Sequence, residues 1–559
     1  MGDRHLSFWM NNSYKPFNEE KKFTFFIVVV AFFSIFSLFG GIMEPDGALY
    51  ASIAKNMILR DDWINLYVRG QDWLDKPHLT FWLAAISFKI FGINDFAYKL
   101  PSLLISWLGC WYIYQFLKHI YSRKIALIAV IIYLTAFHII ISNFDVRAEI
   151  YLSTFTFAGI YYYYKGLRQG FFPILAGSFY LACAVMVKGI FVLIPVIGAF
   201  VCYWLITKQW KEFLRPKWWL ALALVGVFII PELYTLYVQF DSHPEKLVFD
   251  RQGVSGLKFF FWDSQFGRFF NTGPIKGKGD LFFFVHTTLW AFLPWSLLFI
   301  IAVVSGLAKK LRSKRVPEML LITASAGITF VLFSLSKFQL PHYIVIIIPQ
   351  FSIITAIYLG HVDHGKLRTL IAVQHFVFFA IISLIIALLF VFKLAYTTWI
   401  IVLLVTTVVL AYFKLGHSLV QSIVWRSSVV SIVFMLFAYG FFYPQLLKYE
   451  SGREAGLWLK KHRPKNASFV YGAESFAFDF YAPGEVKYVS DVSAIVDNNT
   501  SATVIFTSKE HIAYLQQVFK VRLLEEFHHF HITKLKKEFL YYKTRPTVLG
   551  SYALIEVSK

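Results

Sequence analysis

The sequence contains few cysteines and little charge for its length. Its three cysteines, Cys110, Cys183 and Cys202, are spread over 559 residues and all lie within apolar runs. This distribution predicts neither a disulfide framework nor a cysteine metal cluster. Charged residues make up 16% of the chain. That is too little to cover the surface of a soluble protein of this size, so an ordinary soluble protein is excluded.

Other familiar signatures are missing as well. The sequence has no internal repeat and no low-complexity tract. No close His/Cys/Asp spacing is typical of a zinc site, although ligands from distant loops stay open, and so does a divalent metal. No cleavable signal peptide is expected, because Lys21 and Lys22 directly precede the first apolar run.

Long apolar runs dominate what is present. Apolar residues make up 57% of the chain, in repeated runs near the length that crosses a bilayer. This pattern predicts an all-α polytopic membrane protein. The formal net charge of +21 lies largely beside the apolar runs. Anionic lipid headgroups explain it more simply than nucleic acid, so membrane lipids are expected partners and nucleic acid is not.

The distribution of Lys and Arg predicts about thirteen transmembrane helices, with the N-terminus inside and the C-terminus outside. If the short apolar stretch 79–93 lies in the interface plane, the short cytoplasmic loops are the basic ones. The predicted spans are 23–43, 101–120, 125–142, 148–165, 171–187, 190–206, 218–238, 281–304, 319–336, 342–360, 369–392, 395–413 and 427–444.

Two domains follow from this topology. Residues 1–444 form the transmembrane domain, with outer loops 44–100 and 239–280. Residues 445–559 form a small extracytoplasmic α/β domain, because short β-like runs alternate there with helix-like stretches. The β-like runs are Ser468–Tyr471, Ala502–Phe506 and Tyr552–Val557, and the helix-like stretches are Ala455–His462 and Lys509–Phe519.

The first outer loop gathers carboxylates and a lysine. Glu44 and Asp46 follow the first span, and Asp75-Lys76-Pro77 comes later in the same loop. Asp46 could act as a general base or could orient an acceptor. The simpler interpretation is that this carboxylate caps a helix at the membrane surface. Pro77 restricts Lys76, and a fixed ammonium beside the headgroup layer suits phosphate. The alternative for Lys76 is a snorkelling anchor.

Three later positions place charge at the membrane boundary. Asn143-Phe144-Asp145-Val146-Arg147-Ala148-Glu149 fills a short outer turn, where ionisable groups are costly unless they are used or paired. Lys188 interrupts an apolar run before Gly189, and Arg268 lies in an aromatic stretch of loop 239–280. Arg268 could hold a phosphate through two hydrogen bonds. Each position also has a simpler alternative. Asp145 would only pair with Arg147, Lys188 would snorkel to the headgroup layer, and Arg268 would be an interfacial arginine.

The ordered set of these motifs resembles the bacterial aminoarabinose transferases. With protein O-mannosyltransferases, these enzymes belong to the GT-C class of membrane glycosyltransferases. The resemblance covers residues 20–450 and rests on Met43–Ala54, Asp75-Lys76-Pro77, the Asp145 turn, Lys188-Gly189, Leu293-Pro294-Trp295-Ser296 and Leu340-Pro341-His342-Tyr343.

The resemblance implies a lipid-linked sugar donor, roles for individual residues and a place in the cell. Such enzymes take a sugar from a polyprenyl-phosphate carrier and deliver it, with inversion, to lipid A or another envelope acceptor. The implied location is the bacterial inner membrane, with the active site facing the periplasm or exterior. The implied catalytic residues are Asp46 and Asp145, and the implied substrate-binding residues are Lys76, Arg268, Lys188, Tyr343, Glu44 and Asp75.

The sequence departs from the family pattern at several positions. These departures bear on the identity of the acceptor and on any bound metal more than on the reaction class. The family often has Asp-Glu-x-Arg-Tyr where this chain has Asp46-Gly47-Ala48-Leu49-Tyr50. Asp75 stands where glutamate is common, and Gln265 where a histidine is expected. A protein O-glycosyltransferase and a non-enzymatic transporter or flippase of polyprenyl-linked sugars are the alternative functions. The latter is disfavoured because the polar residues gather in outer loops rather than mid-span.

Overall fold

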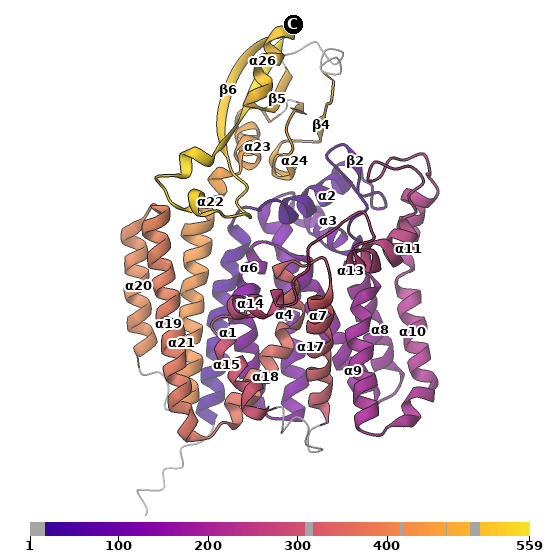
Figure 1. Ribbon diagram of the computed structural model, residues 1–559, viewed down its shortest axis with the longest axis vertical. Helices are drawn as coiled ribbons and strands as arrows, with labels where there is room; N and C mark the ends of the chain where they lie inside the picture. The colour runs from indigo at the N-terminus through magenta and orange to yellow at the C-terminus, as the bar shows by residue number, and fades with distance from the viewer. Residues whose placement is uncertain (1–16, 308–316, 414–417, 465–466, 492–502, 559) are drawn as a thin grey trace, which may run out of the picture.

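The computed structural model describes residues 17–307, 317–413, 418–464, 467–491 and 503–558. It is a bundle of long helices with a small sheet at one end (Figure 1). The basic loop 309–315 and Lys414, which the predicted topology places in the cytoplasm, lie outside the described residues.

Each of the thirteen predicted spans coincides with helix. The bundle consists of α1 (Phe17–Ser34), α4 (Asp95–Ile120), α5 (Arg123–Thr135), α6 (Phe137–Phe144), α7 (Ala148–Gly166), α8 (Phe171–Lys188), α9 (Leu193–Ile206), α10 (Pro216–Phe228), α11 (Ile230–Leu236), α14 (Phe283–Ala291), α15 (Ser296–Ala302), α17 (Glu318–Leu335), α18 (Ile348–His361), α19 (His364–Phe392), α20 (Thr397–Tyr412) and α21 (Leu419–Phe437).

Helix length and composition separate these elements into two groups. Within the described residues, eight helices are long and apolar enough to cross a membrane. A ninth span results if α5 and α6, which are bent by 54° against each other, count as one. The other predicted spans correspond to shorter helices such as α9, α15 and α20, or to α7, which is long enough but less apolar.

The first outer loop folds into two helices at the end of the bundle that also carries the sheet (Figure 1). These are α2 (Asp46–Arg60) and α3 (Leu79–Phe91), with a two-stranded ribbon, β1 (Tyr67–Val68) and β2 (Gln71–Asp72), between them. Most of α2 is buried, from Gly47 to Met57. The second outer loop contributes α12 (Gly256–Lys258), a π-helical segment Phe259–Gly267, and α13 (Arg268–Phe270).

The C-terminal region has a five-stranded sheet of order β4-β3-β5-β7-β6. β3 is parallel to β4 and β5, whereas β7 is antiparallel to β5 and β6. The strands are β3 (Ser468–Tyr471), β4 (Val486–Tyr488), β5 (Thr503–Ser508), β6 (Lys520–His529) and β7 (Gly550–Ser558). The helices are α22 (Tyr443–Leu446), α23 (Ser451–His462), α24 (Phe476–Tyr481), α26 (Lys509–Val518) and α27 (Lys537–Leu540).

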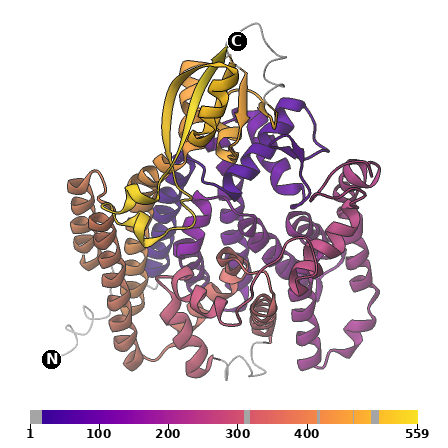
Figure 2. The ribbon, with the colours of Figure 1, turned by 45° about the horizontal axis from the view of Figure 1, so that its top comes forward.

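Alternating side chains give this sheet two apolar faces, as strand geometry requires. Val470 and Phe506 pack with Phe478 of α24 on one face. Phe469 and Ile505 pack with Leu515 of α26 on the other. The predicted α/β character of the C-terminal region is therefore confirmed, while its division from the bundle at residue 444 stays a prediction. Figure 2 shows the sheet beside the segment that carries α2 and α3.

Candidate active site

Asp75, in the turn that precedes α3, pairs with two cations. Lys76 Nζ lies 2.7 Å from Asp75 Oδ2, and Arg268 donates to Asp75 Oδ1. Burial alone would raise the pKa of Asp75, but Lys76 and Arg268 outweigh it and the pKa is lowered. Asp75 therefore remains ionised and holds the ammonium and the guanidinium next to each other.

A buried histidine–glutamate pair fixes this turn to the bundle. Glu232 of α11 accepts hydrogen bonds from the backbone N of His78 at 3.0 Å and lies 3.1 Å from its Nδ1. His78 Nε2 lies 2.8 Å from the carbonyl oxygen of Ile64. Both side chains are fully buried. Because buried polar groups are costly to leave unpaired, this arrangement permits little movement of Lys76.

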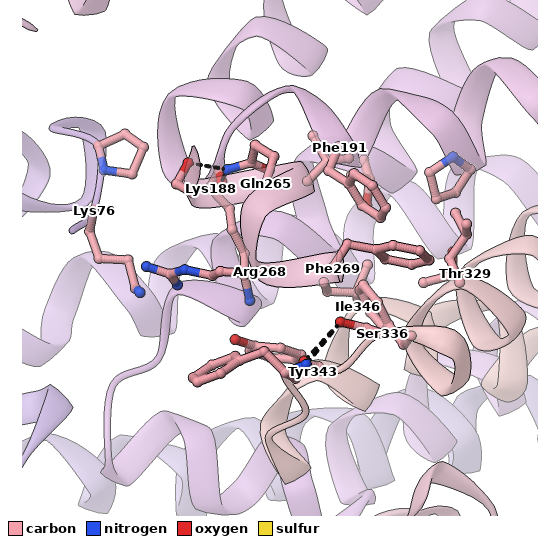
Figure 3. Close-up of a pocket in the computed structure, with 18 of the residues that line it drawn as sticks. Lys76, Lys188, Phe191, Gln265, Arg268, Phe269, Thr329, Ser336, Tyr343 and Ile346 are labelled. Carbon is pink, nitrogen blue, oxygen red and sulfur yellow. Dashed lines mark hydrogen bonds between the residues drawn. The ribbon is translucent and has the colours of Figure 1, made fainter. Parts of the chain in front are cut away.

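Lys76, Asp75, Arg268, Lys188 and Tyr343 line a single cavity. The cavity contains about 1160 Å³ of empty space, part of it open to solvent. Figure 3 shows Lys76 and Arg268 extending toward the same part of it, with Tyr343 on the opposite wall. The rest of the lining is largely apolar and includes Phe191, Val192, Val196, Phe269, Leu332 and Ile346.

Lys188 enters the cavity from the end of α8. Its Nζ donates to Glu149 Oε1 and lies 3.5 Å from the centroid of the Tyr343 ring. Its carbonyl oxygen accepts a hydrogen bond from Gln265 Nε2 at 2.8 Å. Gly189 follows with φ +105°, and a Cβ there would lie 2.3 Å from the same Nε2 atom. Only glycine satisfies both the backbone conformation and this close approach.

Asp46 and Asp145 form a second cluster around Arg147. The guanidinium donates to Asp46 through one nitrogen and to Asp145 through the other. Burial raises the pKa of Asp145, although Arg147 opposes the shift. Burial alone would lower the pKa of Arg147, but Asp145 and Asp46 raise it, so the guanidinium stays charged. A Cβ on Gly47 would lie 2.8 Å from Asp145 Oδ1, which accounts for glycine beside Asp46.

The two clusters share the turn at the start of α7. Arg147 belongs to the Asp46 cluster, whereas Glu149, two residues later, pairs with Lys188 in the cavity. Glu149 Oε2 also lies 3.8 Å from His342 Nε2. Glu149 is absent from the predicted site residues, although its place in an ionisable turn at a membrane boundary was a signal for it. Arg147 was foreseen only as a partner of Asp145.

Glu44 points away from the cavity. Its Oε1 accepts hydrogen bonds from Ser475 Oγ and Ala477 N, both at 2.6 Å. Its backbone N donates to Glu450 Oε1 at 2.8 Å. The structure thus brings together Asp75, Lys76, Lys188, Arg268 and Tyr343, places Asp46 and Asp145 in the adjoining cluster, and ties Glu44 to the C-terminal region. A role for Glu44 in substrate binding stays a prediction.

Metal binding was left open by the sequence. Across the described residues, no group of three or more His, Cys, Asp and Glu side chains is placed to hold a metal ion. Three cations line the cavity together with Asp75 and Glu232, and Glu149 pairs with one of these cations, Lys188. One cation between two carboxylates lies in the adjoining cluster.

Known proteins similar to this chain include glycosyltransferases. The family described as dolichyl-phosphate-mannose-protein mannosyltransferase matches residues 75–234. An undecaprenyl phosphate-alpha-4-amino-4-deoxy-L-arabinose arabinosyl transferase of Yersinia enterocolitica is 24% identical over 56% of this chain and 55% of its own length. An uncharacterized protein of Aquifex aeolicus is 24% identical over 83% of this chain and 87% of its own length.

The whole fold matches a solved enzyme. The crystal structure of ArnT from Cupriavidus metallidurans bound to undecaprenyl phosphate superposes with a TM-score of 0.76, covering 96% of this chain and 97% of that chain, at 17% identity. The chain has the ArnT-like GT-C fold. The predicted fold class and the predicted resemblance to aminoarabinose transferases are confirmed. The arabinosyl transferases themselves are matched over about half of their length.

Proposed function

We propose that the protein is a membrane glycosyltransferase that moves a sugar from a polyprenyl-phosphate carrier to an extracytoplasmic envelope acceptor, with lipid A or another glycolipid favoured. The observation that carries the proposal is the cavity in which Lys76, Arg268 and Lys188 meet among apolar walls. A substrate with a phosphate head and a hydrocarbon tail matches both properties of this cavity.

The charge of the cavity fits a phosphodiester. Lys76, Arg268 and Lys188 outnumber by one the two carboxylates that pair with them, Asp75 and Glu149, while Glu232 in the same wall is engaged by His78. A sugar–phosphate–prenyl diester carries one negative charge. When the sugar leaves, the phosphate becomes a monoester and gains charge. The cations are already in place to stabilise that increase, so they need no reorganisation in the transition state.

The reaction exchanges one carbon–oxygen bond for another. The bond between the anomeric carbon and the phosphate oxygen breaks, and its electron pair stays on the phosphate. An acceptor oxygen bonds to the anomeric carbon from the opposite face, which inverts that centre. If the acceptor is a hydroxyl, Asp46 takes its proton. If the acceptor is a phosphate, no proton needs to be removed and Asp46 orients it instead.

The arrangement of the two clusters supports this division of roles. Lys76 binds the leaving phosphate as a compact point charge, and Arg268 binds it through two parallel N–H groups of its planar guanidinium. Asp46 lies in the Arg147 cluster beside the cavity, joined to it through the turn that carries Glu149. Leaving group and acceptor would therefore be handled by separate charged groups. The predicted topology places both clusters on the extracytoplasmic side.

A labelled donor tests the proposal directly. The full-length protein is reconstituted in vesicles with a radiolabelled polyprenyl-phosphate sugar and either lipid A or an envelope protein fraction. We expect label on the glycolipid, at a strongly reduced rate with Lys76→Ala. Label on protein would instead identify a protein O-glycosyltransferase. Movement of intact donor between leaflets, without any transfer, would identify a flippase and contradict the proposal.

A further inference from the structure

The C-terminal region contacts the bundle through the short helix α24, which lies along α2. At the start of α24, Ser475 and Ala477 donate to the Glu44 side chain, two residues before Asp46. Further along, Ser52 Oγ donates to the carbonyl oxygen of Phe476 at 2.7 Å. Three hydrogen bonds therefore join the start of α24 to the middle of α2 and to the residue two positions before it.

The other end of α24 is held by a buried lysine. Lys55 is 3% exposed, and its Nζ donates to the carbonyl oxygens of Asp479, Phe480 and Ala482 at 2.6, 3.2 and 2.7 Å. The last carbonyls of a helix have no partner within the helix. Lys55 of α2 therefore satisfies the carbonyl groups at the buried C-terminal end of α24, and these hydrogen bonds offset the cost of burying the ammonium.

Three further contacts hold the segments around the start of α2. Tyr481, the last residue of α24, accepts from the backbone N of Ile42 at 2.8 Å and donates to Asp95 at 2.5 Å. Glu450 accepts from the backbone N of Glu44. The segment that leads into Asp46 is thus fixed by the C-terminal region before α2 begins.

We propose that α24 of the C-terminal region positions Asp46 for transfer, and that Lys55 is the positioning residue through which it acts. The proposal rests on the proposed function, because it gives the C-terminal region a task in the same reaction. Lys55 does not touch substrate. It sets the place of α2, and the first residue of α2 is the carboxylate that meets Arg147. Small displacements of a reacting group are costly, about 100-fold in rate for 1 Å.

The test compares Lys55→Met with Lys509→Met in the full-length protein. Lys509 is an exposed lysine of the C-terminal region that pairs with Glu526, and it begins α26, which packs on the face of the sheet opposite α24. We expect Lys55→Met to lower kcat roughly 10- to 100-fold with the donor KM within twofold of wild type. Lys509→Met should change neither. Ser52→Ala, which removes one small hydroxyl, should lower kcat to a lesser extent and guards against a variant that fails to fold.

Amide hydrogen exchange gives a readout that does not depend on turnover. We expect faster exchange at residues 46–50 in Lys55→Met, with the bundle unchanged. An unaltered kcat, a raised donor KM at unaltered kcat, or faster exchange throughout the bundle would each overturn the positioning role. If the wild-type protein transfers no sugar, the proposed function fails, and exchange at residues 46–50 alone decides whether α24 holds this segment.

Discussion

The Lys188 ammonium lies 3.5 Å from the centroid of the Tyr343 ring while Glu149 accepts a hydrogen bond from it. The aromatic face and the carboxylate hold the cation from two directions. This arrangement fixes a lysine that its sequence context would also allow to snorkel. Three elements contribute to it: the end of α8, the start of α7 and the segment that precedes α18.

The Tyr343 ring should matter more than its hydroxyl. Tyr343→Leu removes the aromatic face, and we expect the donor KM to rise roughly 2- to 30-fold, for about 0.5–2 kcal/mol of cation–π interaction. Tyr343→Phe keeps the face and is the matched control, with a donor KM near that of wild type. Steady-state kinetics with varied donor separates the two. Equal effects of both substitutions would assign the role to the hydroxyl.

Loss of a phosphate contact should weaken the transition state strongly. Lys76→Ala and Arg268→Ala should each cost about 2–4 kcal/mol in kcat/KM, by analogy with removal of an oxyanion donor. Arg268→Lys should recover only part of this, because a planar fork becomes a point charge. Lys278→Ala, an exposed lysine of the same loop, serves as control. Wild-type turnover of Lys76→Ala at limiting donor would remove Lys76 from the site.

The two carboxylates of the first loop should behave differently. Asp46→Asn removes basicity, and for a hydroxyl acceptor we expect kcat to fall roughly 10²- to 10⁴-fold. Glu44→Gln should be mild, because an amide oxygen can still accept from Ser475 and Ala477. Single-turnover transfer and donor binding are measured for both variants. If Glu44→Gln is inactive and Asp46→Asn active, the catalytic carboxylate is wrongly assigned.

Gly189 should tolerate no side chain. Gly189→Ala forces a φ of +105° on alanine and places its Cβ against Gln265. We expect about 1–3 kcal/mol of backbone strain and a displaced Lys188, seen as a lower melting temperature and a higher donor KM. Adding Gln265→Ala removes the clash but not the strain, so it should restore only part of the stability. Full recovery in the double variant would show that the clash alone mattered.

Lys55 should give the protein a distinct alkaline response. Burial lowers its pKa to about 8, although Asp479 acts in the opposite direction. An unfolded lysine has a pKa of about 10.4, so between these values the unfolded chain binds a proton that the folded chain does not. Stability from this residue therefore rises with pH from about 8 to about 10.4 and is constant below this window.

Melting temperatures of wild type and Lys55→Met at pH 7.5 and 9.5 test this expectation. The comparison cancels groups common to both proteins, including Lys460 and Glu485, which also act on Lys55. We expect the melting temperature of wild type, relative to the variant, to rise at the higher pH. A constant or shrinking difference would show that burial does not lower the pKa of Lys55.

Local patterns predicted the helices and three of the five C-terminal strands. Apolar length gave the spans, and β-like runs at Ser468–Tyr471 and Tyr552–Val557 became β3 and β7. β4 has only three residues, and β6 shows an exposed, charged pattern along its length, so neither has the apolar alternation that marks a strand. Both are set by pairing with neighbours rather than by their own sequence.

The partners of the site residues could not be foreseen in the same way. The sequence marked Asp75 and Arg268 separately, but 193 positions separate them, and no local rule joins such residues. Glu44 is bound by Ser475, 431 positions away, and no local rule foresees that contact either. Spacing reveals which side chains carry charge at the boundary, whereas only the fold decides which of them meet.

The cations of the cavity are each engaged by a carboxylate: Lys76 and Arg268 by Asp75, and Lys188 by Glu149. An anionic headgroup that enters the cavity therefore replaces Asp75 and Glu149 as the partner of these cations. Few loosely held counterions are released into solution when it binds. Its affinity should depend only weakly on ionic strength, unlike attraction of a charged lipid to an open basic surface. Recognition then comes from how well a headgroup fits between groups that are already fixed, and a bare inorganic anion should compete poorly.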